Sequence, residues 1–202
     1  MNKKIKTLFL FCAAMCVIFT MSCSSEDGRG KLSETLYADY TADISFSMSE
    51  NGQTLDGRAT VSKGDKCVIT FAAPDALEAL SVESDENGES GILQFSYYGM
   101  RLPLPDGALG KINLLLSAFS REMTGNIVSV PKKNIVDYED DLLKSDMAST
   151  QSKLKKTEFL HHDGKTQCVL IYDSLTGHPV SLQMNDGVKN IDIWFEKIKI
   201  TS

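Results

Sequence analysis

The feature that most constrains the fold is a strict alternation of residue types that begins at residue 40. Between Tyr40 and Met48 the even positions are apolar and the odd positions are polar. A period of two predicts a β-strand with one buried face. Asn51-Gly52 follows, a pair that tolerates positive φ and is typical of a hairpin turn. A second strand is expected over Thr54 to Ser62, so the domain opens with an antiparallel hairpin.

The strand pattern continues to the end of the chain. Further strands are expected over 66–73, 81–84, 91–104, 157–161, 165–172, 180–184 and 188–200. Gly, Asn and Asp, which favour turns, separate them at 63–65, 85–88, 163–164, 175–177 and 185–187. Pro74 ends the third strand, and residues 75–80 form a corner. Consecutive hairpins of this kind predict an antiparallel sheet.

One helix is expected to interrupt the strands, over Ala108 to Thr124. Its apolar residues recur every three or four positions, as on one helix face: Leu109, Ile112, Leu115, Leu116, Phe119 and Met123. Asp106 is placed to cap its start and Gly125 its end. Residues 133–153 are polar and acidic, which predicts a loop with one short helix. The expected fold class is α+β: a curved antiparallel sheet forming an unclosed half-barrel, with the helix packed on the concave face.

The N-terminus has the pattern of an export signal. Lys3, Lys4 and Lys6 precede about fifteen mostly apolar residues, too few to span a bilayer comfortably, which takes ~20. Ser22-Cys23 and the polar residues after it resemble the processing site of bacterial lipoproteins, although Thr20 stands where Leu, Val or Ile is usual. The resemblance implies a signal peptide over 1–22, a lipidated Cys23 with a flexible tether over 23–35, and a single domain over 36–202. An uncleaved anchor with an incidental cysteine is the alternative.

The charge balance excludes some partners. The chain has 21 Lys and Arg against 27 Asp and Glu. Residues 1–22 hold three lysines and no acids, so the remainder has 18 against 27 and a net charge near -9. We expect no nucleic-acid partner, because such binding needs a basic surface. Charge alone is also a weak reason for this chain to lie on an anionic membrane.

Motifs for catalysis and for metal binding are absent from the sequence. His161 and His162 are adjacent in a strand and point to opposite faces, and no Cys-x-x-Cys pair or nucleophile elbow occurs. We therefore expect no enzyme activity, no catalytic residue, no metal and no cofactor. Cys67 and Cys168 both lie in expected strands. Two buried thiols are the favoured interpretation, and one disulfide between them is the alternative.

Several segments, in order, resemble one family. They are the alternating strand, the segment Phe71 to Leu77 (FAAPDAL), and the tail in which a strand ends at Asp173 and Thr176-Gly177-His178-Pro179 forms the next turn. This order is similar to that of the LolA/LolB-like lipoprotein-carrier superfamily, over roughly residues 36 to 200. In that family a strand ends in Asp, a Thr-Gly-x-Pro turn follows, and two strands complete the sheet.

The resemblance implies an unclosed barrel whose helices cover an apolar cavity that holds acyl chains. The candidate lipid-contacting residues are Phe46, Ile69, Phe71, Leu77, Phe95, Leu115, Phe119 and Trp194. From the residues alone, a packed core is an equal interpretation. The soluble carrier of the family is not lipidated, so Cys23 implies a membrane-tethered member at the outer face of the bacterial cell membrane.

Two functions are compatible with these features. One is a membrane-anchored lipoprotein that binds a lipid or a lipoprotein acyl chain in an apolar cavity. The other is an interaction or chaperone-like lipoprotein with an envelope protein partner, as in clostridial lipoproteins of this fold that support a cell-wall enzyme in spore germination. The second predicts an exposed patch around Tyr97 to Arg101.

Overall fold

The computed structural model describes residues 27–78, 80–84, 91–95, 100–103, 110–139, 153–161 and 163–201. Within them eleven strands form one sheet, in the order β6-β5-β4-β3-β2-β1-β11-β10-β9-β8-β7. The bounds are β1 Tyr40–Glu50, β2 Gln53–Lys63, β3 Cys67–Ala73, β4 Leu80–Ser84, β5 Gly91–Phe95, β6 Met100–Pro103, β7 Ile135–Asp137, β8 Leu154–Leu160, β9 Gln167–Asp173, β10 Pro179–Asn185 and β11 Lys189–Ile200.

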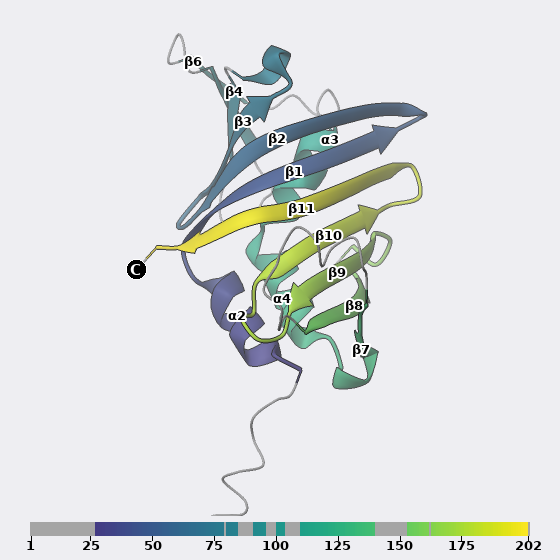
Figure 1. Cartoon of the computed structure of the whole chain (residues 1–202). Coiled ribbons are helices and arrows are strands. Elements are labelled where there is room, and N and C mark those ends of the chain that lie inside the picture. The colour runs from purple at the N-terminus through teal and green to yellow at the C-terminus, as the bar shows by residue number, and fades with distance from the viewer. Residues whose placement is uncertain are drawn as a thin grey trace, which may run out of the picture.

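The sheet is antiparallel throughout and is not closed into a barrel. Each pair of neighbours is consecutive in the chain except β1 and β11, whose pairing joins the two halves of the sheet. The order ends at β6 on one side and at β7 on the other, and no ladder joins these edges within the described residues. The sheet curves around the helices, as Figure 1 shows. The expected α+β half-barrel is confirmed.

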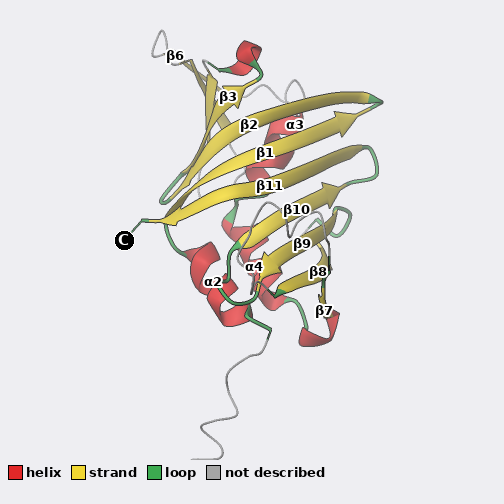
Figure 2. Cartoon of the chain, in the orientation of Figure 1, coloured by secondary structure: helices red, strands yellow, loops and turns green. Residues whose placement is uncertain are grey.

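In the described residues, three α-helices accompany the sheet: α2 Arg29–Tyr37, α3 Gly110–Ser117 and α4 Arg121–Ser129. Two 3₁₀ turns, η1 Asp75–Leu77 and η2 Lys132–Asn134, complete the described elements. Helix α3 packs on β1 and β11, and α4 packs on α2 and β8. These helices lie on the concave side of the sheet (Figure 2).

The burial of β1 follows the alternation of the sequence. Its even positions from Tyr40 to Met48 are all buried, whereas the odd positions are at least partly exposed. The other predicted strands are present, with ends that differ by a few residues. The expected strand over 91–104 is two strands, β5 and β6. The region 133–153 contains a strand, β7, that the sequence pattern did not predict.

The single helix expected over Ala108 to Thr124 is wrong, because the chain forms two helices. Helix α3 ends at Ser117, and Ser120 begins α4: its hydroxyl accepts a hydrogen bond from the Met123 amide at 3.1 Å. A serine oxygen at this position satisfies an amide that has no partner inside the helix. The expected C-cap, Gly125, lies inside α4, and the expected N-cap, Asp106, lies outside the described residues.

The flexible tether expected over 23–35 is also wrong from Arg29 onward. Residues Arg29–Tyr37 form α2, in which Leu32, Thr35 and Leu36 are buried. The helix docks closely on the turn between β9 and β10. A Cβ atom on Gly28 would lie 2.2 Å from the Ser174 carbonyl oxygen, and one on Gly177 would lie 2.3 Å from the Lys31 carbonyl carbon. Both glycines have positive φ, so the chain needs glycine there for conformation and for space.

Candidate functional site

The concave face of the sheet is an almost unbroken apolar surface. The register places opposing residues in rows that cross six strands, from β2 to β8. One row is Gly57, Phe46, Ile193, Leu182, Leu170 and Thr157. The next is Leu55, Met48, Ile191, Met184, Cys168 and Phe159. Of these twelve positions, only Thr157 carries a hydroxyl, so the surface under the helices is suited to hydrocarbon.

Most of the candidate lipid-contacting residues come together in the core between the sheet and the helices. Five of them belong to one buried core cluster: Phe46, Ile69, Phe71, Leu115 and Phe119. A sixth, Leu77, is partly buried and packs against that cluster. The rings of Phe46 and Phe71 meet edge to face with centroids 5.9 Å apart, and Phe119 meets Phe195 in the same way at 6.1 Å. The side chain of Phe95 lies outside the described part of the structure. That any of them contacts a lipid stays a prediction.

Trp194 does not lie on this surface. Its neighbours Ile193 and Phe195 are buried on the concave face, so Trp194 points to the opposite face, where its side chain is 39% exposed. It stands opposite Ser45 and Ser181 in the outer row. The expectation that Trp194 lines the interior is therefore wrong. The alternation of β11 already contains this information, because Ile191, Ile193 and Phe195 share one phase and Trp194 has the other.

Three methionines in the core were not predicted as part of the site. Met48, Met123 and Met184 are each at most 1% exposed, and they come from β1, α4 and β10. Methionine is unbranched and adapts to irregular neighbours, which makes it common on surfaces that repack around different ligands. The sequence does indicate that Met48 is buried, because it occupies an even position in the alternating first strand.

Within the part of the chain that the structure describes, two buried polar atoms have no hydrogen-bond partner: Thr157 Oγ1 on β8 and Asn126 Nδ2 on α4. Thr157 is only 2% exposed and belongs to the concave row. Helix α4 packs on β8, so the two elements that carry these atoms are in contact. A buried donor without an acceptor costs about 1–3 kcal/mol. Both groups can donate to an acceptor such as a carbonyl oxygen.

Lys63 lies at one end of the concave face, between the sheet and two helices. Its Nζ atom donates to the Leu36 carbonyl oxygen at 2.6 Å and to Thr124 Oγ1 at 3.0 Å, and it stands 5.6 Å from the centre of the Tyr40 ring. Burial lowers the pKa of the Lys63 ammonium to about 8. The lysine therefore joins β2 to the C-terminal end of α2 and to α4, where a cation also suits the carbonyl end of a helix.

The two cysteines of the domain are free and buried. Burial raises the pKa of the Cys67 thiol and of the Cys168 thiol to about 12 in each case. This agrees with the prediction of buried thiols and not with the alternative of a disulfide. Among the described residues, no three His, Cys, Asp or Glu side chains gather closely enough to hold a metal ion.

A separate groove lies at the edge of the sheet, outside the apolar interior. Its volume is about 420 Å³, and Asn134, Val136, Lys156 and Glu158 line it. Lys156 and Glu158 form an ion pair there at 2.7 Å. This mixed, charged lining does not suit an acyl chain. Across the described residues, no helix is both long and apolar enough to span a bilayer.

Comparison with known proteins gives similarity at the level of structure. No family model matches the chain, and no curated protein matches it. Among solved structures, the chain is similar to a LolA superfamily protein from Nitrosomonas europaea, with 8% identity and a TM-score of 0.43, over 90% of this chain and 95% of that one. It is also similar to LprF from Mycobacterium bovis, with 11% identity and a TM-score of 0.43, over 88% and 97%.

A third similar structure is a putative outer membrane lipoprotein-sorting protein domain from Vibrio parahaemolyticus. It has 8% identity and a TM-score of 0.41, over 86% of this chain and 89% of that one. At such identities and TM-scores the likeness concerns the fold and carries no statement about activity. The structural neighbours of the chain thus include LolA superfamily and lipoprotein-sorting proteins, in line with the resemblance found in its sequence motifs.

Proposed function

We propose that the chain is a membrane-anchored lipoprotein that binds a lipid or a lipoprotein acyl chain between the curved sheet and helices α3 and α4. The observation that carries this proposal is the apolar concave face, in which two rows cross six strands with Thr157 as the one hydroxyl. An acyl chain placed there gains about 0.8 kcal/mol for each CH₂ group removed from water.

The covering helices suit reversible access to this surface. Helices α3 and α4 are short, with 8 and 9 residues, and between them the Phe119 and Ser120 amides bond to the carbonyl oxygens three residues back, in a tighter turn that separates the two helices. A break of this kind lets one helix move without the other. The ligand replaces contacts that α3 makes with β1 and β11, and the adaptable methionines repack around it.

The unpaired donors give the ligand an orientation. Thr157 Oγ1 and Asn126 Nδ2 are suited to the ester or carboxyl oxygen of an acyl chain, the polar end of an otherwise apolar molecule. Lipidation of Cys23 holds the protein at the membrane from which such a molecule comes. The sequence supports this anchor through the lysines and the apolar run that precede Cys23.

Lipid extraction tests the proposal. The full chain is expressed in bacteria, purified from membranes in mild detergent, exchanged into a lipid-free detergent and extracted with organic solvent. Covalent acyl groups stay on the protein, whereas a bound lipid enters the extract and is identified by mass spectrometry. We expect close to one lipid per chain. A W194F variant, changed on the outer face, should carry the same lipid in the same amount.

An empty extract, together with no uptake of a fluorescent fatty acid, would contradict lipid binding. The interaction function would then be preferred, with the apolar surface serving only as the core of the fold. The patch expected for that function around Tyr97 to Arg101 lies largely outside the described residues.

A further inference from the structure

The described chain begins on one face of the molecule, which we call the underside. It consists of residues 27–31, the 3₁₀ turn η2 and the turn between β9 and β10 at 173–178. Hydrogen bonds fix these segments to one another. Tyr172 Oη donates to the Asp27 carbonyl oxygen at 2.7 Å, and Arg29 Nη1 donates to the Val130 carbonyl oxygen, next to η2, at 2.6 Å. The start of the described chain is therefore held in place on this face.

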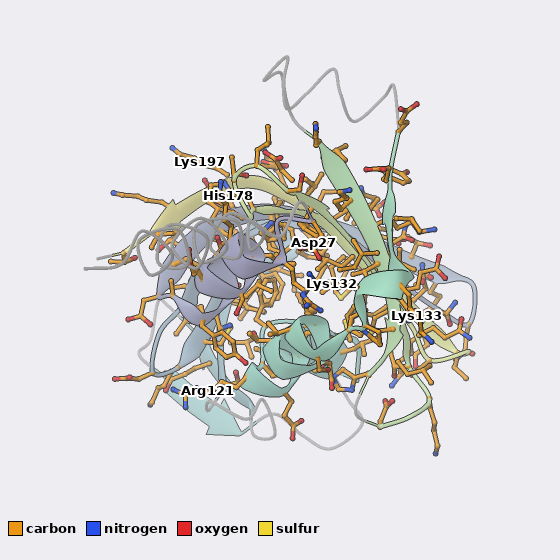
Figure 3. The ribbon with its side chains drawn as sticks, turned by 90° about the horizontal axis from the view of Figure 1, so that it is seen from below. Asp27, Arg121, Lys132, Lys133, His178 and Lys197 are labelled. Atoms are coloured by element: carbon orange, nitrogen blue, oxygen red, sulfur yellow. The ribbon has the colours of Figure 1, made fainter. Side chains whose placement is uncertain are left out.

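The underside collects positive charge in an acidic protein. Arg29 and Lys31 lie at the start of α2, and Lys132 and Lys133 lie in η2, where both are exposed. The carboxylate of Asp27 lies among them and accepts the Arg29 amide. Figure 3 views this face, with Asp27 near its middle and Lys132 and Lys133 beside it. The local excess of cations contrasts with the net charge of -6 of the whole chain.

An apolar side chain projects from the same face. Leu175, at the tip of the β9–β10 turn, is 43% exposed. Its carbonyl oxygen accepts a hydrogen bond from Lys31 Nζ at 2.6 Å, so the leucine and the lysine are neighbours. An exposed leucine beside lysines is the pattern of a segment that enters the interface of a bilayer, with the apolar group inward and the ammonium groups near the phosphates.

The short segment between Cys23 and Asp27 limits how far the underside can lie from an acyl chain on Cys23. Only residues 24–26 separate Cys23 from Asp27, and four fully extended residues reach at most ~14 Å. We propose that the underside lies against the anionic headgroups of the membrane that holds the acyl chains of Cys23, with Leu175 inserted at the interface. This inference rests on the proposed lipidation of Cys23. It assigns the molecule one orientation, in which the edge strand β6 and helix α3 stand away from the bilayer (Figure 1).

Site-specific fluorescence tests the orientation. The mature lipidated chain carries a single environment-sensitive label, either as L175C or as K165C, and is reconstituted in vesicles of phosphatidylcholine with 30% phosphatidylglycerol, a composition of our choosing. Lys165 is exposed in the β8–β9 turn, at the other end of β9. We expect emission from position 175 to shift to shorter wavelength and to be quenched by headgroup-labelled lipid, and emission from position 165 to remain that of water.

Charge reversal provides the matched control. The double substitution K132E/K133E should remove the shift at position 175, whereas K197E/K199E, which makes the same change of charge on β11, should leave it. High salt should weaken the shift, because exposed charges are screened over ~10 Å at 0.1 M. Similar emission at positions 175 and 165 in a chain whose intact mass includes acyl groups would overturn the orientation alone. An intact mass without acyl groups would overturn the anchor, and the orientation with it.

Discussion

The ring of Phe46 lies directly against Gly57 of the neighbouring strand: a Cβ atom at position 57 would stand 2.3 Å from Cζ of the ring. The same Cβ would lie 2.6 Å from the Ala73 carbonyl oxygen, which is backbone and cannot rotate away. Phe46 thus uses the missing side chain of Gly57 as part of its own packing site. Three strands, β1, β2 and β3, meet at this point.

We predict that G57A destabilises the fold by about 1–3 kcal/mol, the usual cost of adding a methyl group to a filled core. Urea unfolding followed by circular dichroism measures the change. Gly125 offers the matched control, since nothing lies within 4 Å of a Cβ built there, inside α4. G125A should stabilise the protein by about 0.5–1 kcal/mol. Equal effects of the two substitutions would contradict the packing described for Phe46.

Lys63 predicts a specific dependence of stability on pH. Its pKa is about 8 in the folded state against 10.5 ordinarily, so between these values the unfolded chain binds more protons. Stability from this group therefore rises as pH increases from about 8 to 10.5. The wild type minus K63M difference in unfolding free energy should rise over this window, while the cysteines and tyrosines are common to both proteins. A flat difference would show that Lys63 titrates normally.

Ser120 predicts a measurable contribution from the cap of α4. S120A removes the oxygen that accepts the Met123 amide and should cost about 1 kcal/mol of stability. S129A is the comparison, because that exposed hydroxyl donates to the Asn126 carbonyl oxygen at the far end of the helix. It should change the unfolding free energy by a few tenths of a kcal/mol. Thermal unfolding of the wild type, S120A and S129A under the same conditions measures these differences in stability.

Because the hydroxyl of Thr157 has no hydrogen-bond partner, we predict that its removal raises stability and weakens lipid binding. T157V keeps the shape and removes a buried donor that has no acceptor, so the lipid-free protein should gain about 1 kcal/mol. Retention of an ester lipid should fall. T166V is the contrasting variant, because the buried hydroxyl of Thr166 donates to Asp163 at 2.6 Å, and its loss should destabilise. Destabilisation by T157V without lipid would mean that its hydroxyl has a partner.

We predict that the thiols of Cys67 and Cys168 do not react with alkylating reagents in the folded protein. With pKa values near 12, Cys67 and Cys168 are protonated at pH 8 and buried. Iodoacetamide should leave both unmodified in the native protein and should modify both in denaturant without a reductant, as read by peptide mass spectrometry. A requirement for reduction before labelling would reveal a disulfide instead.

Most of the sheet could be predicted from the sequence, because most of its strands have a strong local signal; β7, with three residues, has none. The alternation from Tyr40 to Met48 and the turns at Asn51-Gly52 and Asn185-Asp186-Gly187 depend on neighbouring residues alone. The helices were harder for physical reasons. The apolar spacing of three and four continues across Ser120, so periodicity does not detect a break that depends on one hydroxyl and one amide. Helix α2 has only a weak apolar stripe and is held by its contacts with α4 and the β9–β10 turn.

Some residues of the candidate site could likewise be predicted from local periodicity, and others could not. Phe46, Ile69 and Phe71 follow from strand phase, and Leu115 and Phe119 from helix phase. Trp194 does not join them, because its phase in β11 places it on the outer face of the sheet. The unpaired atoms of Thr157 and Asn126 could not be foreseen, because satisfaction of a polar atom depends on every neighbour in space.

The pairing of β1 with β11 affects how the chain folds. It matches Tyr40 with Ile200, so the ladder at the centre of the sheet joins the first strand of the chain to the last. Contacts between residues so distant in sequence slow folding, because the entropy cost of closing a long loop comes before the contact is gained. Until the final residues have been synthesised, β1 lacks one of its two neighbours, and no complete core can form around it. A chain with this topology completes its central ladder only when its last strand, β11, is present.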